Sequence, residues 1–147
     1  MSKFPWWDST LTIYNRYEDA QTHVISWFAT VVSDCFWKAT GNEISINNIA
    51  LDTNTLLARI PKRADFMERY LWVELPNDSK ASYFTLGVGD IIIKGEVTDT
   101  INEYVAGYRS SDLIEKYKSS PGCMIIDRYS NNTGTGRCQQ HYLVMGK

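Results

Sequence analysis

The chain lacks the features by which many enzymes and metal proteins are found from sequence. Its 147 residues include only three cysteines and two histidines. The cysteines are Cys35, Cys123 and Cys138, an odd number without a C-x-x-C pair, which argues against a disulfide scaffold and a zinc ribbon. No phosphate-binding loop, G-x-S-x-G or H-E-x-x-H motif is present. We therefore expect no catalytic residue, no cofactor and no metal.

Two further absences limit the partners and the location. The formal net charge is -2, from 15 basic and 17 acidic residues, and no run of lysine or arginine gives the electrostatic footprint of a tight nucleic-acid binder. No stretch approaches the ~20 apolar residues of a membrane helix. The N-terminus has aromatic residues but no long apolar core of a signal peptide. We expect no membrane partner and a reducing compartment.

The histidines and cysteines give two weak chemical signals, and each has a simpler explanation. Cys138 and His141 have C-x-x-H spacing, and Cys123 could act as a third metal ligand. Positions three apart on a strand face opposite sides, so a small buried cysteine and a hydrogen-bonded histidine explain the pattern better. His23 could partner Cys35 or Asp34 in nucleophilic catalysis, but its place beside an expected hairpin turn favours a surface or interface role.

A β-strand pattern, by contrast, runs through the chain. Alternating and β-branched residues predict strands at 10–17, 22–32, 35–39, 56–60, 83–97, 123–129 and 139–145. The segment 83–97 is divided by glycines into two strands, and 71–75 is extended. Short helices are expected at 63–70 and 112–118, and a long Asn-rich loop at 38–55 has room for one short strand at 44–46. The fold class is mainly β: a small antiparallel β-barrel or sandwich with long loops, forming a single domain over 1–147 with an N-terminal aromatic arm, 1–8.

Aromatic side chains near polar ones mark candidate contacts with other subunits. Trp6 and Trp7 either plug one end of the barrel or anchor a neighbouring subunit, because tryptophan and tyrosine dominate interface hot spots. Tyr104, Tyr108 and Arg109 lie in a polar loop and have the same two interpretations: a contact with another subunit, or a loop packed on its own barrel.

Four segments together resemble a family of small tailed-bacteriophage proteins encoded among the head–tail joining genes. They are IYNRYED, CFWKATG, YFTLGVGDIIIKGEV and the ending HYLVMGK, and the resemblance runs from about Leu11 to Lys147. It implies a head-completion or stopper protein, a β-barrel that forms a six-fold ring in the phage neck, retains packaged DNA and docks the tail. The loop 38–55 would then face the channel or a neighbouring ring. Its candidate contact residues are Lys38, Asn42, Glu43, Asn47, Asn48, Asp52 and Asn54.

The resemblance also implies the partners and the location. The ring would lie between an adaptor or portal ring above and a tail terminator or tail tube below, in the neck of a virion assembled in the host bacterial cytoplasm. Double-stranded DNA would pass through it without sequence specificity. A globule roughly 40 Å across around a duplex roughly 20 Å wide allows about five or six subunits in the ring.

Two other functions are left open by the sequence. A tail-terminator or tail-completion ring protein is one, and a higher helix content would favour it. A small β-barrel that binds a ligand or single-stranded nucleic acid is the other, with Tyr83 and Phe84 as residues that could stack bases. An enzyme is the least favoured alternative.

Overall fold

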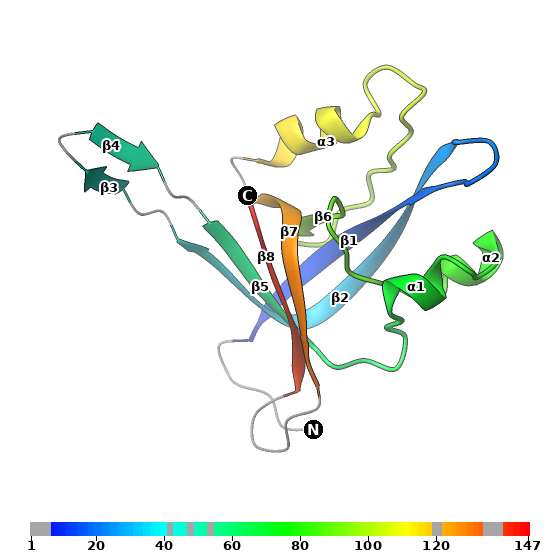
Figure 1. The fold of residues 1–147 in the computed structure, drawn as a ribbon, viewed down its shortest axis with the longest axis horizontal. Helices are drawn as coiled ribbons and strands as arrows, with labels where there is room; N and C mark the ends of the chain where they lie inside the picture. The colour runs from blue at the N-terminus through cyan, green and yellow to red at the C-terminus, as the bar shows by residue number, and fades with distance from the viewer. Residues whose placement is uncertain (1–6, 41–42, 47–48, 53–54, 119–121, 134–139) are drawn as a thin grey trace.

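The computed structural model describes residues 7–40, 43–46, 49–52, 55–118, 122–133 and 140–147. Six antiparallel strands form a closed barrel in the order β1–β2–β5–β8–β7–β6 (Figure 1). The barrel strands are β1 (Ser9–Glu18), β2 (Ile25–Thr40), β5 (Thr55–Pro61), β6 (Ile91–Lys94), β7 (Cys123–Asn132) and β8 (His141–Gly146). The expected mainly β, antiparallel barrel is confirmed.

A β-bulge explains the interruption expected in the second strand at Ser33 and Asp34. Ser9 pairs with Cys35 but Leu11 pairs with Val32, so β2 carries one more residue than β1 over this stretch. Asp34 takes a positive φ of 60°. Such a bulge bends a strand and increases its twist, as barrel closure requires. The sequence break is therefore a bend inside one strand, β2.

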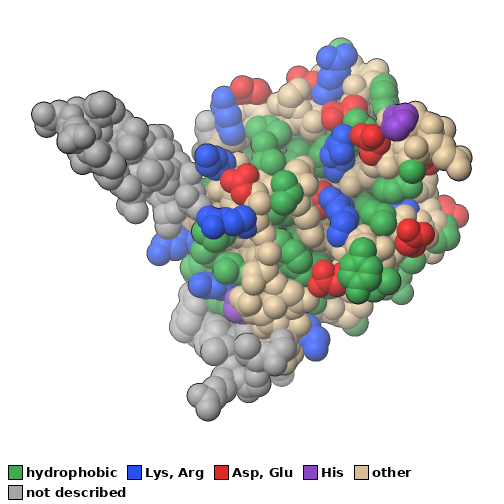
Figure 2. Space-filling view, viewed as in Figure 1, with side chains coloured by type: hydrophobic (Ala, Val, Ile, Leu, Met, Phe, Trp, Pro, Cys, Tyr) green, Lys and Arg blue, Asp and Glu red, His purple; other side chains and the backbone are tan. Residues whose placement is uncertain are grey.

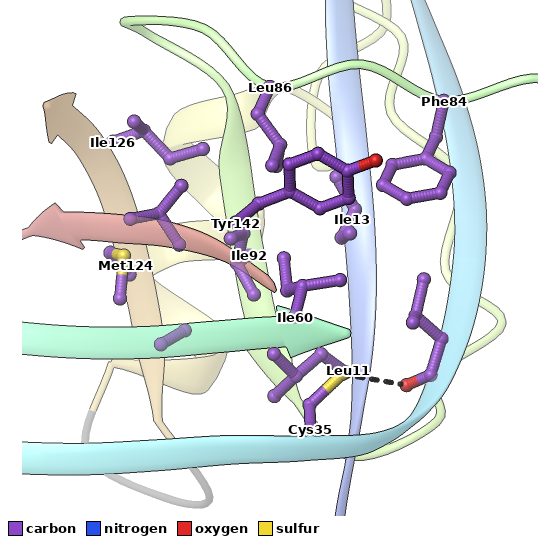
Figure 3. Close-up of a cluster of buried hydrophobic side chains, with 13 residues drawn as sticks. Leu11, Ile13, Cys35, Ile60, Phe84, Leu86, Ile92, Met124, Ile126 and Tyr142 are labelled. Carbon is purple, nitrogen blue, oxygen red and sulfur yellow. Dashed lines mark hydrogen bonds between the residues drawn. The ribbon is translucent and has the colours of Figure 1, made fainter. Parts of the chain in front are cut away.

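The barrel interior is a packed hydrophobic core. Inward-facing residues of all six strands meet there, joined by Phe84 and Leu86 from the chain before β6 (Figure 3). The core cluster consists of Leu11, Ile13, Val32, Cys35, Ala58, Ile60, Phe84, Leu86, Ile92, Met124, Ile126, Tyr142 and Val144. Each large side chain buried in this way stabilises the fold by about 1.5–3 kcal/mol relative to exposure.

Three short helices lie outside the barrel: α1 (Arg69–Trp72), α2 (Asn77–Lys80) and α3 (Ser110–Tyr117). The third confirms the helix expected near 112–118. It covers the outer side of β1 and β6, where Leu113 joins a second buried cluster with Tyr14, Ile91 and Ile93. One face of β6 packs in the barrel core and the other is covered by α3. This explains why β6 has apolar residues on both faces.

The expected helix at 63–70 is wrong, as is the extended segment at 71–75. Phe66 forms a parallel bridge with Phe84, and its ring stacks on Tyr142 with 4.0 Å between ring centres. These contacts keep the chain out of a helix until Arg69, and α1 then runs through Trp72. The segment 83–97 likewise holds one strand, β6, and the Phe84 bridge rather than two strands.

The expected long loop at 38–55 is also wrong, although the short strand expected within it at 44–46 is confirmed as part of β3. β2 continues to Thr40, and beyond it the strands β3 (Glu43–Ile46) and β4 (Ile49–Asp52) form an antiparallel hairpin. Thr40 pairs with Thr55, and Glu43 pairs with Asp52, three residues further along each strand. The β3–β4 pairing therefore has the same register as the β2–β5 pairing. The hairpin prolongs β2 and β5 away from the barrel (Figure 1). No helix in the described residues is long and apolar enough to cross a membrane.

Candidate interaction surface

The β3–β4 hairpin leaves the body of the molecule (Figure 1). Its register sets Ile44 opposite Leu51 and Ile46 opposite Ile49. Because alternate residues of a strand share a face, these four aliphatic residues belong to one face of the hairpin. The other face contains Glu43, which pairs with Asp52.

Two of the seven residues expected to form the channel or ring contact, Glu43 and Asp52, lie in this hairpin. Glu43 and Asp52 are partners in the backbone register of the hairpin. Lys38 is exposed on β2, nearer the barrel. The remaining four, Asn42, Asn47, Asn48 and Asn54, lie outside the described residues.

The outer face of β2, β5, β8 and β7 forms a basic surface with an apolar centre. Pairing aligns eight outward positions in two rows. One row is Phe36, Arg59, Leu143 and Ser130, and the other is Lys38, Leu57, Met145 and Arg128. Three of these positions are basic and none is acidic. We call these eight residues the basic sheet face. Figure 2 shows that, over the face of the molecule it draws, basic and acidic side chains are interspersed.

The basic sheet face is hollowed over β7 and β8. A pocket of about 450 Å³ is lined by Arg128, Tyr129, Ser130, Leu143 and Met145. Leu143 and Met145, two of its lining residues, are half-buried. Nearby, the Arg59 guanidinium carbon lies 5.3 Å from the centre of the Phe36 ring. A cation beside apolar side chains suits a partner that offers both apolar residues and negative charge.

The loop before α3 holds the predicted contact residues Tyr104, Tyr108 and Arg109 at the surface. Tyr104 and Tyr108 are 61% and 58% exposed. The Tyr104 hydroxyl accepts a hydrogen bond of 2.9 Å from the Ile25 backbone N–H, so it also attaches the loop to the start of β2. The Arg109 backbone N–H donates to the Asp112 carboxylate at 3.2 Å, which closes the first turn of α3. The loop is thus packed on its own barrel and keeps two tyrosine rings exposed.

A second pocket lies between that loop and α3. It has a volume of about 330 Å³, and Tyr108, Arg109 and Lys116 contribute to its lining. The Lys116 ammonium is held by the Asp99 carboxylate at 2.7 Å, and the same carboxylate accepts a 2.6 Å hydrogen bond from the Tyr117 hydroxyl. These bonds lower the pKa of Asp99. The charged groups at this pocket therefore neutralise each other and serve to attach α3.

Trp7 is buried in its own chain, with 3% of its surface exposed. Its ring meets His141 edge-on, with 5.7 Å between ring centres. This geometry favours a plug at the barrel end over an anchor for a neighbouring subunit. Trp6 lies outside the described residues.

The weak chemical signals do not assemble into a site. Cys123 begins β7, whereas His141 pairs with Asn132 at the opposite end of the β7–β8 pair. His23 is exposed at the tip of the β1–β2 hairpin, near Glu18, while Cys35 is buried at the other end of β2. Burial raises the pKa of the Cys35 thiol to about 12 and that of Cys123 to about 11. Cys138 lies outside the described residues, and the rest contain no cluster of three potential metal ligands.

A buried polar network, which sequence reasoning missed, attaches α1 to β1. The fully buried Asp90 accepts hydrogen bonds from the Arg16 backbone N–H (3.0 Å), the Asn15 side-chain amide (2.9 Å) and the Arg69 guanidinium (2.8 Å). Burial raises the pKa of Asp90, while Arg69 and the hydrogen bonds oppose that rise. Asn15 also exchanges hydrogen bonds with the Thr85 backbone. The signal in the sequence was an asparagine among the buried residues of β1.

The two aromatic residues that could stack on nucleic-acid bases, Tyr83 and Phe84, are not on an exposed surface. Phe84 is fully buried and lies edge-on to Phe66, and Tyr83 is half-buried. A nucleic-acid base would have to displace the core to reach Phe84. This weakens the case for a single-stranded nucleic-acid binder.

The fold and surface define a small closed β-barrel with a projecting hairpin and a basic outer sheet face. Within that class, the chain matches the family described as "Family of unknown function (DUF6751)" over residues 6–147. It therefore belongs to this family. No curated protein and no solved structure matches it.

Proposed function

We propose that this protein is a structural subunit of the neck of a tailed bacteriophage, of the head-completion or stopper type. Copies would form a ring, about six-fold, that retains packaged DNA and docks the tail. The observation that carries the proposal is the closed antiparallel barrel from which a two-stranded hairpin projects. The proposed location, the phage neck, rests on the resemblance of the sequence to head–tail joining proteins.

The filled barrel supports a structural role over small-molecule binding. The interior is occupied by the hydrophobic core, so the part of the barrel that the structure describes is filled by its own side chains. The hairpin supports assembly, because it prolongs β2 and β5 beyond the closed barrel, toward the space that a neighbouring copy would occupy in a ring. A tail-terminator ring is less well supported, since the described helices have four, four and eight residues.

The test is electron microscopy of virions produced without this protein. We expect full-length tails separated from heads, and heads that have lost their DNA. Supplying the full chain in trans should restore joined particles. The variant Tyr70→Ser should restore them equally well and serves as a control, because Tyr70 lies on α1 and is 70% exposed. Normal attachment of tails to DNA-filled heads in the absence of the protein would contradict the proposal.

A further inference from the structure

We propose that the loop before α3 of one copy docks on the basic sheet face of a second copy, with its exposed aromatic rings over the hollow lined by Leu143 and Met145. The inference rests on the proposed ring of identical subunits and names one contact that would build it. We call the donor surface the tyrosine loop, residues 102–108. Its exposed aromatic and aliphatic side chains are Tyr104, Val105 and Tyr108.

The tyrosine loop presents these side chains from a fixed backbone. The Asn102 N–H donates to the Tyr108 carbonyl at 2.7 Å, and the Tyr108 N–H donates to the Val105 carbonyl at 3.1 Å. The Tyr104 hydroxyl is bound to the backbone at the start of β2, next to Val24, which is 48% exposed. Aromatic rings held in this way bury apolar area on binding at a low cost in conformational entropy.

The charges around the tyrosine loop are complementary to those of the basic sheet face. The segments 16–26 and 99–118, which surround the loop, contain six acidic and four basic residues, a net charge of -2. Backbone hydrogen bonds lower the pKa of Asp19, so this exposed carboxylate is ionised at neutral pH. The basic sheet face has three cations and no acid. Attraction between the two surfaces favours their encounter and fixes their orientation.

The hollow on the basic sheet face suits an aromatic side chain. Its volume of about 450 Å³ lies within the range of about 300–1,000 Å³ found for ligand pockets. Leu143 and Met145 offer apolar contacts, and Arg128 supplies a cation that attracts the face of an aromatic ring. The chain already makes such a pair close by, where the Arg59 guanidinium lies over the Phe36 ring.

The two surfaces lie at different positions around the barrel. The basic sheet face is centred on β5 and β8, whereas the tyrosine loop is attached at the start of β2 and leads into α3, outside β1 and β6. The contact is therefore heterologous, so it repeats from copy to copy and closes into a ring when the rotation allows it. An isologous dimer through two basic sheet faces would instead bring six cations together and is disfavoured.

The first experiment tests the proximity of the two surfaces by cross-linking. Two variants of the full chain are prepared in a Cys138→Ser background, one with Val105→Cys and one with Leu143→Cys, and their mixture is treated with a bismaleimide. We expect a cross-linked dimer from the mixture and little from either variant alone, because Cys35 and Cys123 are buried. The control replaces Val105→Cys by Tyr70→Cys, on α1. It should cross-link about tenfold less, because only docking raises the effective concentration of the two thiols.

The second experiment measures self-association of the uncross-linked chain by analytical ultracentrifugation up to millimolar concentration. Tyr108→Ser should weaken association about tenfold or more, because tyrosines at the centre of an interface carry much of its binding energy. The matched control is Tyr70→Ser, the same change at an exposed tyrosine outside both surfaces, and it should leave association unchanged. Leu143→Glu and Arg128→Glu should also weaken association, as should a higher salt concentration.

The outcomes separate this contact from the proposed function. Oligomers that survive both Tyr108→Ser and Leu143→Glu overturn the tyrosine-loop contact and leave the neck function standing. A chain that stays monomeric at millimolar concentration and gives no cross-link from the mixture overturns the self-contact. Cross-linked rings of a chain that phage particles do not need would support the contact and contradict the neck function.

Discussion

The buried pair of Asp90 and Arg69 gives the sharpest test of the fold. Arg69→Met removes the guanidinium that donates to Asp90 at 2.8 Å and to the Arg16 carbonyl at 3.2 Å. Asp90 then stays fully buried with two donors, from Asn15 and the Arg16 backbone. Breaking a buried ion pair costs about 3–5 kcal/mol. Because the Arg69 side chain is 31% exposed, water replaces part of the lost interaction, and we expect a loss of about 2–3 kcal/mol in the free energy of unfolding.

This loss should depend on pH. Arg69 is the strongest influence that lowers the pKa of Asp90, so its removal raises that pKa further above the unfolded value of 3.8. Between the two pKa values the folded variant binds more protons than the unfolded chain, and its stability falls as pH rises. The deficit relative to the unaltered protein should therefore be largest at pH 7.5 and smaller near pH 4.5.

Urea unfolding followed by tryptophan fluorescence measures the effect at each pH. Arg109→Met is the matched control, an exposed arginine whose replacement should change stability by less than about 0.5 kcal/mol. The double variant Arg69→Met/Asp90→Asn should recover part of the loss, because no buried charge remains. A deficit below about 0.5 kcal/mol at pH 7.5, or one that grows on acidification, would refute the reasoning.

Three further changes test other parts of the structure. Trp7→Ala should lower the free energy of unfolding by about 3 kcal/mol, because the ring is buried and leaves a cavity; a loss under about 1 kcal/mol in urea unfolding would show that it is not packed. Gly146→Ala should cost about 3 kcal/mol or more, because the new Cβ would overlap the Ile125 carbonyl oxygen; an unchanged thermal midpoint by circular dichroism would contradict this. In a Cys138→Ser chain, Cys35 and Cys123 should react with a thiol reagent at pH 8 only as fast as the protein unfolds, because burial raises the pKa of both thiols; immediate labelling would argue against their burial.

The strands could be predicted because their signal is local. Alternation in β8 shows directly which residues face the core, whereas the middle of β1 is buried on both faces. The bulge at Asp34 left a visible break in the pattern of β2. The helix at 63–70 failed because tertiary contacts overrode spacing: Phe66 pairs with Phe84 and stacks on Tyr142. Sequence spacing cannot show a partner eighteen or more residues away.

The hairpin was missed although its signal is present. The asparagines around it are typical of a loop. However, Ile44 and Ile46 alternate with polar residues before Asn47 and Asn48, and Ile49 and Leu51 have the same spacing after them. That arrangement is typical of two strands joined by a short turn. The basic sheet face could not be predicted in the same way. Its residues come from four strands, and only the pairing register brings them together.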